Sequence, residues 1–417
     1  MISLIEALNF RCLRYVSQPL GPFHVLVGPN ASGKTTFLDV VAFLSRLVQD
    51  GLEEAVNQRT RNFSDLVWQR QGSGFELAVE AKIPDGLRDK LHHPEYDTIR
   101  YEIAIELNAA TGEVSIADER GLLRVSQPRR PSQQALFPQL LAPPDTIRSP
   151  KGKRTRSLFA KKRGGNDNYY SERHPIEGRW APAFRLGPRK STLGNLPEDE
   201  TNFPVSTWFK QLLTDGVEQI ILNSLRIRLA SAPGQGAGFK PDGSNLPWVI
   251  ADLAAKSPAR MKEWIAHLQT ALPDLENIKT TLREDDKHRY IVLVYRGGLE
   301  VPSWMASDGT LRLLALTLPA YLDGLKGVFL IEEPENGIHP RAVETMFQSL
   351  SSVYDAQVLT ATHSPVILSI TDAKNVLCFA KTDDGATDIV LGSEHPRLQE
   401  WRGEENLGTL FAAGVLG

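Results

Sequence analysis

Val27-Gly28-Pro29-Asn30-Ala31-Ser32-Gly33-Lys34-Thr35-Thr36 is the stretch that decides the fold. From Gly28 to Thr35 it matches the pattern G-x-x-x-x-G-K-[ST] at every defined position. The apolar segment 23–27 before it predicts a strand, and the periodicity after it predicts a helix from Thr35 to about Val48. Glycines let backbone N–H groups turn toward a phosphate, and a helix start adds a positive dipole end. The stretch therefore predicts a phosphate-binding loop between a strand and a helix.

Side chains within this loop carry chemistry that suits a nucleotide and a metal ion. We expect Lys34 to contact the β- and γ-phosphates and the Thr35 hydroxyl to ligate Mg²⁺. ATP and Mg²⁺ are therefore the predicted cofactors. The residues expected to bind the nucleotide in this loop are Asn30, Ser32, Gly33, Lys34, Thr35 and Thr36.

A second motif follows an apolar segment near the C-terminus. Residues 327–331 form a continuous apolar run, which predicts a buried strand, and Glu332-Glu333-Pro334-Glu335 follows directly. An acidic cluster alone is usually a solvated loop, but after a buried strand the first acid can hold the Mg²⁺ shell and the next can activate water. We predict Glu332 on the metal side and Glu333 as the catalytic base. Because the first acid is more often Asp, Glu332 is expected to reach Mg²⁺ through water.

Two further short segments are candidates, each with an ordinary structural alternative. Residues 306–310 precede an amphipathic helix, so the hydroxyl of Ser307 and nearby N–H groups could bind an anion, or Ser307 or Asp308 could simply cap the helix. His363 follows a short strand at 357–361, and a lone histidine there is more often structural. The residues alone leave both alternatives open.

The rest of the chain predicts an α/β fold with two kinds of sheet. Residues 75–83, 99–107 and 114–117 alternate with period two, which favours an antiparallel sheet with one wet face. Apolar strands that alternate with helices toward the C-terminus favour a parallel core sheet, to which the N-terminal strand contributes. Helical patterns are expected at 205–229, 245–270, 308–322 and 340–353, and further strands at 278–282, 289–295 and 357–361.

Composition divides the chain into four predicted parts. Residues 1–125 are expected to form the N-terminal half of the nucleotide-binding domain, which we call the head. Residues 126–204, rich in Pro, Gly, Ser, Arg and Lys, are expected to form a long insertion of loops and short helices. Residues 205–300 form a helical subdomain with strands, and 301–417 form the C-terminal half of the head.

The motifs, in this order, resemble those of the ABC ATPases of the RecF/SMC branch. More narrowly, they resemble the AAA-labelled ATPases allied to the overcoming-lysogenisation-defect proteins and to ATPase subunits of bacterial anti-phage systems. The resemblance covers roughly 1–110 and 205–380 and implies a P-loop NTPase fold of the ABC type. The matching stretches are Asn9-Phe10, Val27–Leu38, Pro241–Leu246, Ser307–Arg312, Ile331–Pro340 and Thr362–Pro365.

The resemblance also implies roles for the two short segments. Ser307, Asp308 and Gly309 would form the signature loop, in which Asp308 and Thr310 depart from the usual Ser-Gly-Gly-Gln, and His363 would be the switch histidine that contacts the γ-phosphate. It implies a head-to-tail homodimer in which the partner's Ser307 and Gly309 complete the site at Lys34. Residues 336–339 would lie in the family's dimer-bridging loop. The lid glutamine is not assigned, and its candidates are Gln69, Gln71 and Gln127.

The leading functional hypothesis is an ATPase that gates a separately encoded effector, such as a TOPRIM-like or HNH nuclease, in anti-phage defence. The alternatives are a RecF-like repair ATPase that acts directly on DNA and a scaffold that binds ATP without hydrolysing it. No long heptad segment interrupts the head, so a rod protein is not expected. The chain runs on for about 50 residues past His363, which is short for a TOPRIM domain, so no nuclease domain is expected in it.

Residues 151–190 hold many cations and three acids, with Tyr169, Tyr170 and Trp180 interleaved. Cations could neutralise phosphates and aromatic rings could stack on bases, so this segment is a candidate nucleic-acid contact. A solubilising loop or a docking arm for an acidic partner fits equally well. The cations are Lys151, Lys153, Arg154, Arg156, Lys161, Lys162, Arg163, Arg173, Arg179, Arg185, Arg189 and Lys190.

Bulk composition sets the remaining limits. The 417 residues include 47 Lys plus Arg and 50 Asp plus Glu, and the net charge of -3 excludes a wholly basic nucleic-acid binder. Cys12 and Cys378 are too few and too far apart for a disulfide framework, so free thiols in a reducing compartment are expected. The chain shows no signal peptide and no apolar run of the roughly 20 residues that a membrane helix needs. We therefore expect a soluble, cytoplasmic protein without a membrane partner.

Overall fold

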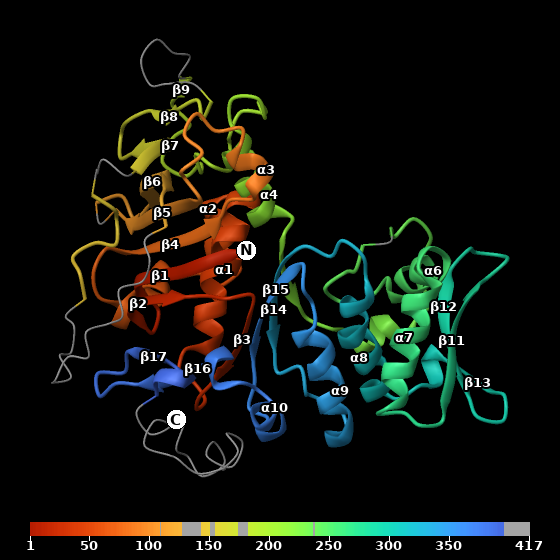
Figure 1. Ribbon diagram of the computed structural model, residues 1–417. Helices are drawn as coiled ribbons and strands as arrows, with labels where there is room; N and C mark the ends of the chain where they lie inside the picture. Colours follow the sequence, from red (N-terminus) through yellow and green to blue (C-terminus); the bar gives the residue numbers. More distant parts are fainter. Residues whose placement is uncertain (109, 127–142, 151–154, 174–181, 237, 396–417) are drawn as a thin grey trace. The chain divides into compact units, whose positions relative to one another are not determined.

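The computed structural model (Figure 1) describes residues 1–108, 110–126, 143–150, 155–173, 182–236 and 238–395. Contacts between residues divide the chain into two compact units. The first unit contains residues 1–21, 29–217 and 379–389, and the second contains 22–28, 218–378 and the segment from 390 on. The predicted four parts are not separate in this division, because the N-terminal half and the insertion share one sheet.

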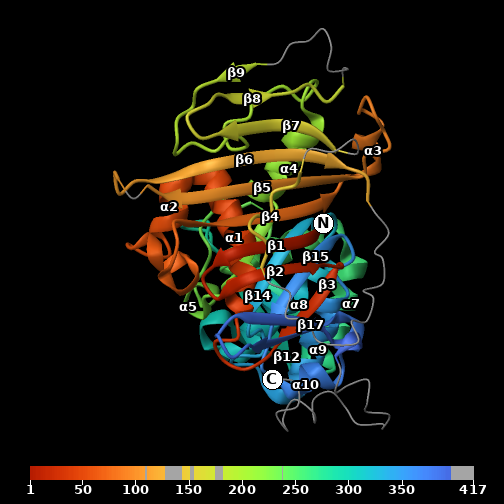
Figure 2. The same cartoon turned by 90° about the vertical axis from the view of Figure 1, so that its left-hand side faces the viewer.

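The first unit is built on an eight-stranded antiparallel sheet, shown broadside in Figure 2. Its strand order is β2-β1-β4-β5-β6-β7-β8-β9. β2 lies on one side of β1, and the strands from β4 to β9 follow on the other side in sequence order. The strands are β1 (Ile2–Phe10), β2 (Leu13–Pro19), β4 (Gly74–Lys82), β5 (Thr98–Leu107), β6 (Val114–Arg124), β7 (Thr155–Lys162), β8 (Asp167–Tyr169) and β9 (Ala183–Phe184).

Helix α1 (Lys34–Asp50) is the main helix of the first unit. Its apolar face is fully buried, and its Phe43 ring lies 5.8 Å from Phe10 of β1 and 5.7 Å from Phe75 of β4, centroid to centroid. These contacts attach the helix that follows the phosphate loop to the sheet. The other helices and 3-10 turns of this unit are α2 (Leu52–Asn57), η1 (Phe63–Leu66), η2 (Trp68–Arg70), α3 (Asp85–Arg88) and α4 (Pro204–Thr214).

The insertion is more regular than its composition predicts. We expected loops and short helices at 126–204, and this is wrong for β7, which pairs with β6 in the sheet. Arg156 and Lys161 look like surface residues by type, yet both are buried. Lys161 Nζ lies 2.7 Å from Asp167, and Arg156 donates to the Ser171 carbonyl at 2.6 Å. Because paired cations can be buried, the alternation of this strand is not visible in its hydrophobicity.

The buried Lys161–Asp167 pair gives a stability prediction. Both side chains are almost fully excluded from solvent, so Lys161→Met should leave an unpaired buried carboxylate and lower the free energy of unfolding by about 3–5 kcal/mol. Lys162→Met, at the exposed neighbouring position, should change it by less than about 0.5 kcal/mol. Urea denaturation of both variants measures the difference. Equal effects would mean that Asp167 does not depend on this cation.

The second unit contains the parallel core that the sequence predicts. Strands β3 (Phe23–Val27), β14 (Gly327–Glu332), β15 (Ala356–Ala361) and β16 (Val376–Lys381) run parallel. The sheet order is β10-β14-β15-β3-β16-β17, with β10 (Val217–Ile220) and β17 (Thr387–Leu391) at its edges. The boundary between the units falls within β10, β16 and β17. The core is thus assembled from both ends of the chain, as expected.

The second unit also contains helices and a small antiparallel sheet of β11 (Leu275–Leu282), β12 (Arg289–Tyr295) and β13 (Leu299–Pro302). The helical pattern expected at 205–229 is divided, because the chain turns at Gly216 into β10 and Asn223 then caps a new helix. The helices and 3-10 turns of the second unit are α5 (Ser224–Arg228), α6 (Leu246–Lys256), α7 (Pro258–Gln269), η3 (Ser303–Met305), α8 (Asp308–Thr317), η4 (Leu318–Tyr321), α9 (Pro340–Ser351), α10 (Pro365–Ser369), η5 (Ala373–Asn375) and η6 (Gly392–Glu394).

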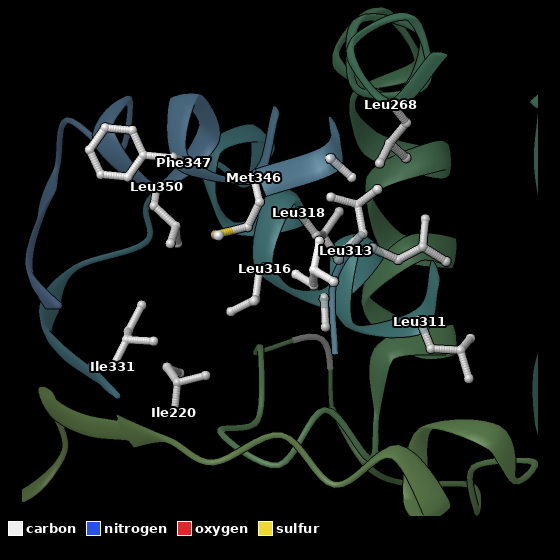
Figure 3. Packing of buried hydrophobic residues seen from close by; sticks show 14 of the residues in the cluster. Ile220, Leu268, Leu311, Leu313, Leu316, Leu318, Ile331, Met346, Phe347 and Leu350 are labelled. Carbon is white, nitrogen blue, oxygen red and sulfur yellow. The ribbon is translucent and has the colours of Figure 1, made fainter. Parts of the chain in front are cut away.

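Figure 3 shows how the hydrophobic core of the second unit joins these elements. Side chains from α7, α8, α9 and β14 converge and exclude water, which is the main source of their stability. The cluster therefore fixes the start of α8 relative to the end of β14. Its labelled members are Ile220, Leu268, Leu311, Leu313, Leu316, Leu318, Ile331, Met346, Phe347 and Leu350.

Both cysteines are free thiols, as predicted. Burial raises the pKa of the Cys378 thiol to about 12, so it stays protonated at neutral pH. None of the helices in the described ranges combines the length and apolar character that crossing a membrane requires.

Candidate nucleotide-binding site

The phosphate loop lies where the sequence predicts it, between a strand and a helix. β3 ends at Val27 and α1 begins at Lys34. Between them the backbone takes positive φ at Gly28 (149°), Ala31 (62°) and Gly33 (105°). Left-handed residues in succession with right-handed ones turn peptide N–H groups into a concave surface that binds anions.

Gly33 has no room for a side chain. A Cβ there would lie 2.2 Å from Thr387 Oγ1 and 3.1 Å from Cys12 Sγ. Thr387 Oγ1 also donates to the Ser32 carbonyl at 2.9 Å, and Cys12 Sγ donates to Thr36 Oγ1 at 3.4 Å. Thr387 and Cys12 therefore support the loop from distant parts of the chain. Sequence reasoning missed both, because neither lies in a motif.

The loop residues fit a nucleoside triphosphate. Ser32 Oγ is completely buried and has no hydrogen-bond partner among the described residues. Lys34 is folded back over the loop, where its Nζ donates to the Pro29 carbonyl at 3.0 Å. A buried hydroxyl without a partner and a lysine held at the loop are donors that a phosphate would engage. Asn30 and Thr35 are exposed, so both are accessible to a ligand.

Three parallel strands of the second unit end in line. Leu26 of β3 pairs with Ala361 of β15, which in turn pairs with Glu332 of β14. Beyond this line, Thr362 N donates to the Leu26 carbonyl at 3.1 Å and Glu333 N donates to the Ala361 carbonyl at 2.8 Å. Binding sites in parallel sheets form at such carboxyl ends. The first residue of the phosphate loop, the paired acids and the histidine segment all leave the sheet from this edge.

Glu333 is held in an unusual backbone conformation. Its φ is 46°, which is costly for a residue with a side chain and is often found at functional sites. Asn336 N donates to the Glu333 carbonyl at 3.0 Å, and the Asn336 amide Nδ2 donates to Glu333 Oε2. Asn336 therefore orients the carboxylate of the predicted base. Its place three residues after Glu333 is a signal that sequence reasoning did not use.

Ser307 caps the start of α8, which is the structural alternative that the sequence left open for residues 306–310. Ser307 Oγ accepts a hydrogen bond from Thr310 N at 3.1 Å and shares one with Thr310 Oγ1 at 2.7 Å. Asp308 pairs with the Arg228 guanidinium, whose Nε lies 3.0 Å from Asp308 Oδ1. Arg228 thus compensates the acid that departs from the usual signature sequence. The role of Ser307, Asp308 and Gly309 in nucleotide binding stays a prediction.

Gly309 packs directly against the loop that follows the acids. A Cβ on Gly309 would lie 2.5 Å from the Gly337 carbonyl oxygen. Gly337 itself has a φ of 75°. The signature segment and the segment that contains Asn336 are therefore in backbone contact within one protomer.

The lid glutamine remains a prediction. Gln69 has a φ of 49°, and its Nε2 donates to the Asp384 carbonyl at 3.3 Å. Gln71 is exposed, and Gln127 lies outside the described residues.

The basic segment 151–190 presents fewer free cations than its sequence indicates. The expectation that Arg156 and Lys161 lie on a nucleic-acid surface is wrong, because both are buried. Tyr169 is also buried, and its hydroxyl donates to the Thr192 carbonyl at 2.8 Å. A nucleic-acid contact stays a prediction for the exposed cations. Lys151, Lys153, Arg154, Arg179 and Trp180 lie outside the described residues.

The fold and the site define a class of protein. A phosphate loop after β3, acids after β14 and a separate antiparallel sheet make this an ABC-type P-loop ATPase fold. Two solved SMC head structures share it. One, bound to the C-terminal winged-helix domain of ScpA, has a TM-score of 0.53 at 13% identity and covers 93% of this chain and 97% of that one. The other, from Pyrococcus furiosus, has a TM-score of 0.52 at 12% identity and covers 96% and 99%.

A family model described as "AAA domain, putative AbiEii toxin, Type IV TA system" matches residues 23–369. The chain belongs to this family of AAA-domain proteins. A curated relative, an OLD nuclease of Thermus scotoductus, is 46% identical over 41 residues. That match spans 10% of this chain and 8% of the relative.

Proposed function

We propose that this chain binds and hydrolyses ATP in a head-to-tail homodimer, and that the cycle gates a separately encoded effector in anti-phage defence. The observation that carries the proposal is the alignment of the carboxyl ends of β3, β14 and β15. This alignment gathers the start of the phosphate loop, the paired acids and the histidine segment at one sheet edge. Family membership supports ATP as the ligand.

In this proposal each motif has one role. Lys34 and the loop amides hold the phosphates, and Thr35 and Glu332 hold Mg²⁺, which neutralises charge on the phosphates. Glu333 positions and deprotonates the attacking water, and Asn336 keeps its carboxylate oriented. His363 contacts the γ-phosphate. Ser307 and Gly309 meet the nucleotide of the partner protomer.

The effector and the biological role rest on the relatives. The family description names a toxin of a toxin–antitoxin system, and the relative with the short match is a nuclease. An SMC head is solved with part of another protein, ScpA, bound to it. These names support an ATPase that acts together with a second protein. A TOPRIM-like or HNH nuclease is the effector we propose.

The head-to-tail dimer is tested by mixing two inactive variants. Ser307→Ala removes the signature hydroxyl and leaves the Gly309–Gly337 contact in place, so it should impair the partner's site alone and lower turnover by about 10²-fold. Lys34→Ala should remove nucleotide binding. In an equal mixture about half of the dimers are mixed, and each has one intact composite site, so about a quarter of the wild-type activity should return.

The control for the serine is Ser73→Ala, at an exposed position directly before β4, where activity should not change. Activity of the mixture is measured as phosphate release at constant total protein. A mixture no more active than the sum of its components would exclude sites shared between protomers.

A further inference from the structure

The turn after the paired acids contains a third acid, Glu335, whose side chain contacts the histidine segment. Glu335 Oε1 accepts a hydrogen bond from Thr362 Oγ1 at 2.7 Å and another from His363 N at 3.0 Å. Thr362 Oγ1 in turn accepts from Ser364 N at 2.9 Å. One carboxylate oxygen therefore fixes three successive residues of the histidine segment.

These are the only side-chain hydrogen bonds of Glu335 among the described residues. Its other oxygen, Oε2, is closed off from solvent and has no partner among the same residues. A buried carboxylate oxygen without a donor lowers the free energy of unfolding. The position of Glu335 is therefore not explained by a contribution to the stability of the fold. Its contacts all serve the segment that carries His363.

The backbone of Glu335 belongs to the turn that carries the predicted base. Ile338 N donates to the Glu335 carbonyl at 3.0 Å, and Asn336 N donates to the Glu333 carbonyl at 3.0 Å. On the other side, Thr362 N is bonded to Leu26 of β3. Glu335 thus connects the turn of Glu333 to the residue next to His363, at the edge where the phosphate-loop strand also ends.

We propose that Glu335 is a positioning residue that sets the distance between the base Glu333 and the histidine His363. It acts through the Thr362 hydroxyl and the main chain of the histidine segment. This inference rests on the proposed function of that sheet edge. A carboxylate oxygen has two lone pairs, so one oxygen of Glu335 can accept from a hydroxyl and an amide at the same time.

Two variants separate this role from a general structural one. Glu335→Ala removes the acceptor, so kcat for ATP should fall by about 10²-fold while the KM changes little, because the phosphate loop is untouched. Glu335→Gln keeps an oxygen that can accept both bonds, so kcat should stay within about 3-fold of the wild type. Glu344→Ala, on the exposed face of α9, is the control and should leave kcat and KM unchanged.

Hydrogen exchange gives a readout that does not depend on turnover. The His363 amide should lose protection in Glu335→Ala, and it should keep protection in Glu335→Gln and in Glu344→Ala. If the wild type does not hydrolyse ATP, the proposed function fails while the exchange result still reports the positioning.

Three results would overturn the inference. The first is unchanged His363 protection in Glu335→Ala. The second is lost protection with an unchanged kcat, which would show that the position of the histidine segment does not matter for turnover. The third is a Gln variant as impaired as the Ala variant, which would assign the effect to charge rather than to the accepted bonds.

Discussion

Lys34→Ala should abolish ATP binding. The lysine is only 7% exposed and is already held at the phosphate loop by its bond to the Pro29 carbonyl. Its ammonium is the charged donor for the phosphates, so its removal should weaken affinity by about 10²-fold or more. Titration calorimetry with ATP and Mg²⁺ measures the loss directly.

Lys82→Ala, at an exposed position on β4, is the matched control and should bind as the wild type does. Circular dichroism of both variants shows whether the fold is retained. ATP affinity that survives in a folded Lys34→Ala protein would remove the phosphate loop from the proposed site.

Glu333→Gln should keep ATP binding, unlike Lys34→Ala, and should lose ATP hydrolysis. The amide cannot accept a proton from water, so kcat should fall by about 10³-fold. Because ATP then persists in the site, the variant should accumulate as a dimer when ATP and Mg²⁺ are present. Analytical ultracentrifugation with and without nucleotide measures this.

Glu263→Gln, exposed on α7, is the control for a change of one charge and should behave as the wild type. The comparison with Lys34→Ala also separates hydrolysis from scaffolding. A protein that uses ATP only to hold its structure would keep the same assembly in the wild type and in Glu333→Gln. Identical nucleotide occupancy in Lys34→Ala and Glu333→Gln would contradict the roles assigned to these residues.

The parts of this site that the sequence predicts are those encoded by consecutive residues. The loop from Gly28 to Thr35 and the strand before Glu332 combine a local pattern with a local backbone shape, and both occur where expected. The parallel sheet could also be predicted, because a buried strand is apolar along its whole length.

The parts that could not be predicted depend on contacts between distant segments. Thr387 and Cys12 support the phosphate loop, and Arg228 pairs with Asp308, yet no spacing in the sequence relates these residues. Strand β7 was missed for a related reason. Its buried cations are compensated by Asp167 and by a carbonyl, and such compensation is invisible to a hydrophobicity pattern.

The contact between Gly309 and Gly337 has a consequence for how the two halves of a dimer would communicate. Neither residue has a side chain, so the contact has no rotamers that could absorb a displacement. In the proposed dimer, a shift of the signature loop caused by a neighbour's ligand would press directly on the main chain beside Asn336. A change in the nucleotide bound to one protomer would then displace the loop that orients Glu333 in the other protomer, because no side chain lies between the two backbones to absorb the movement.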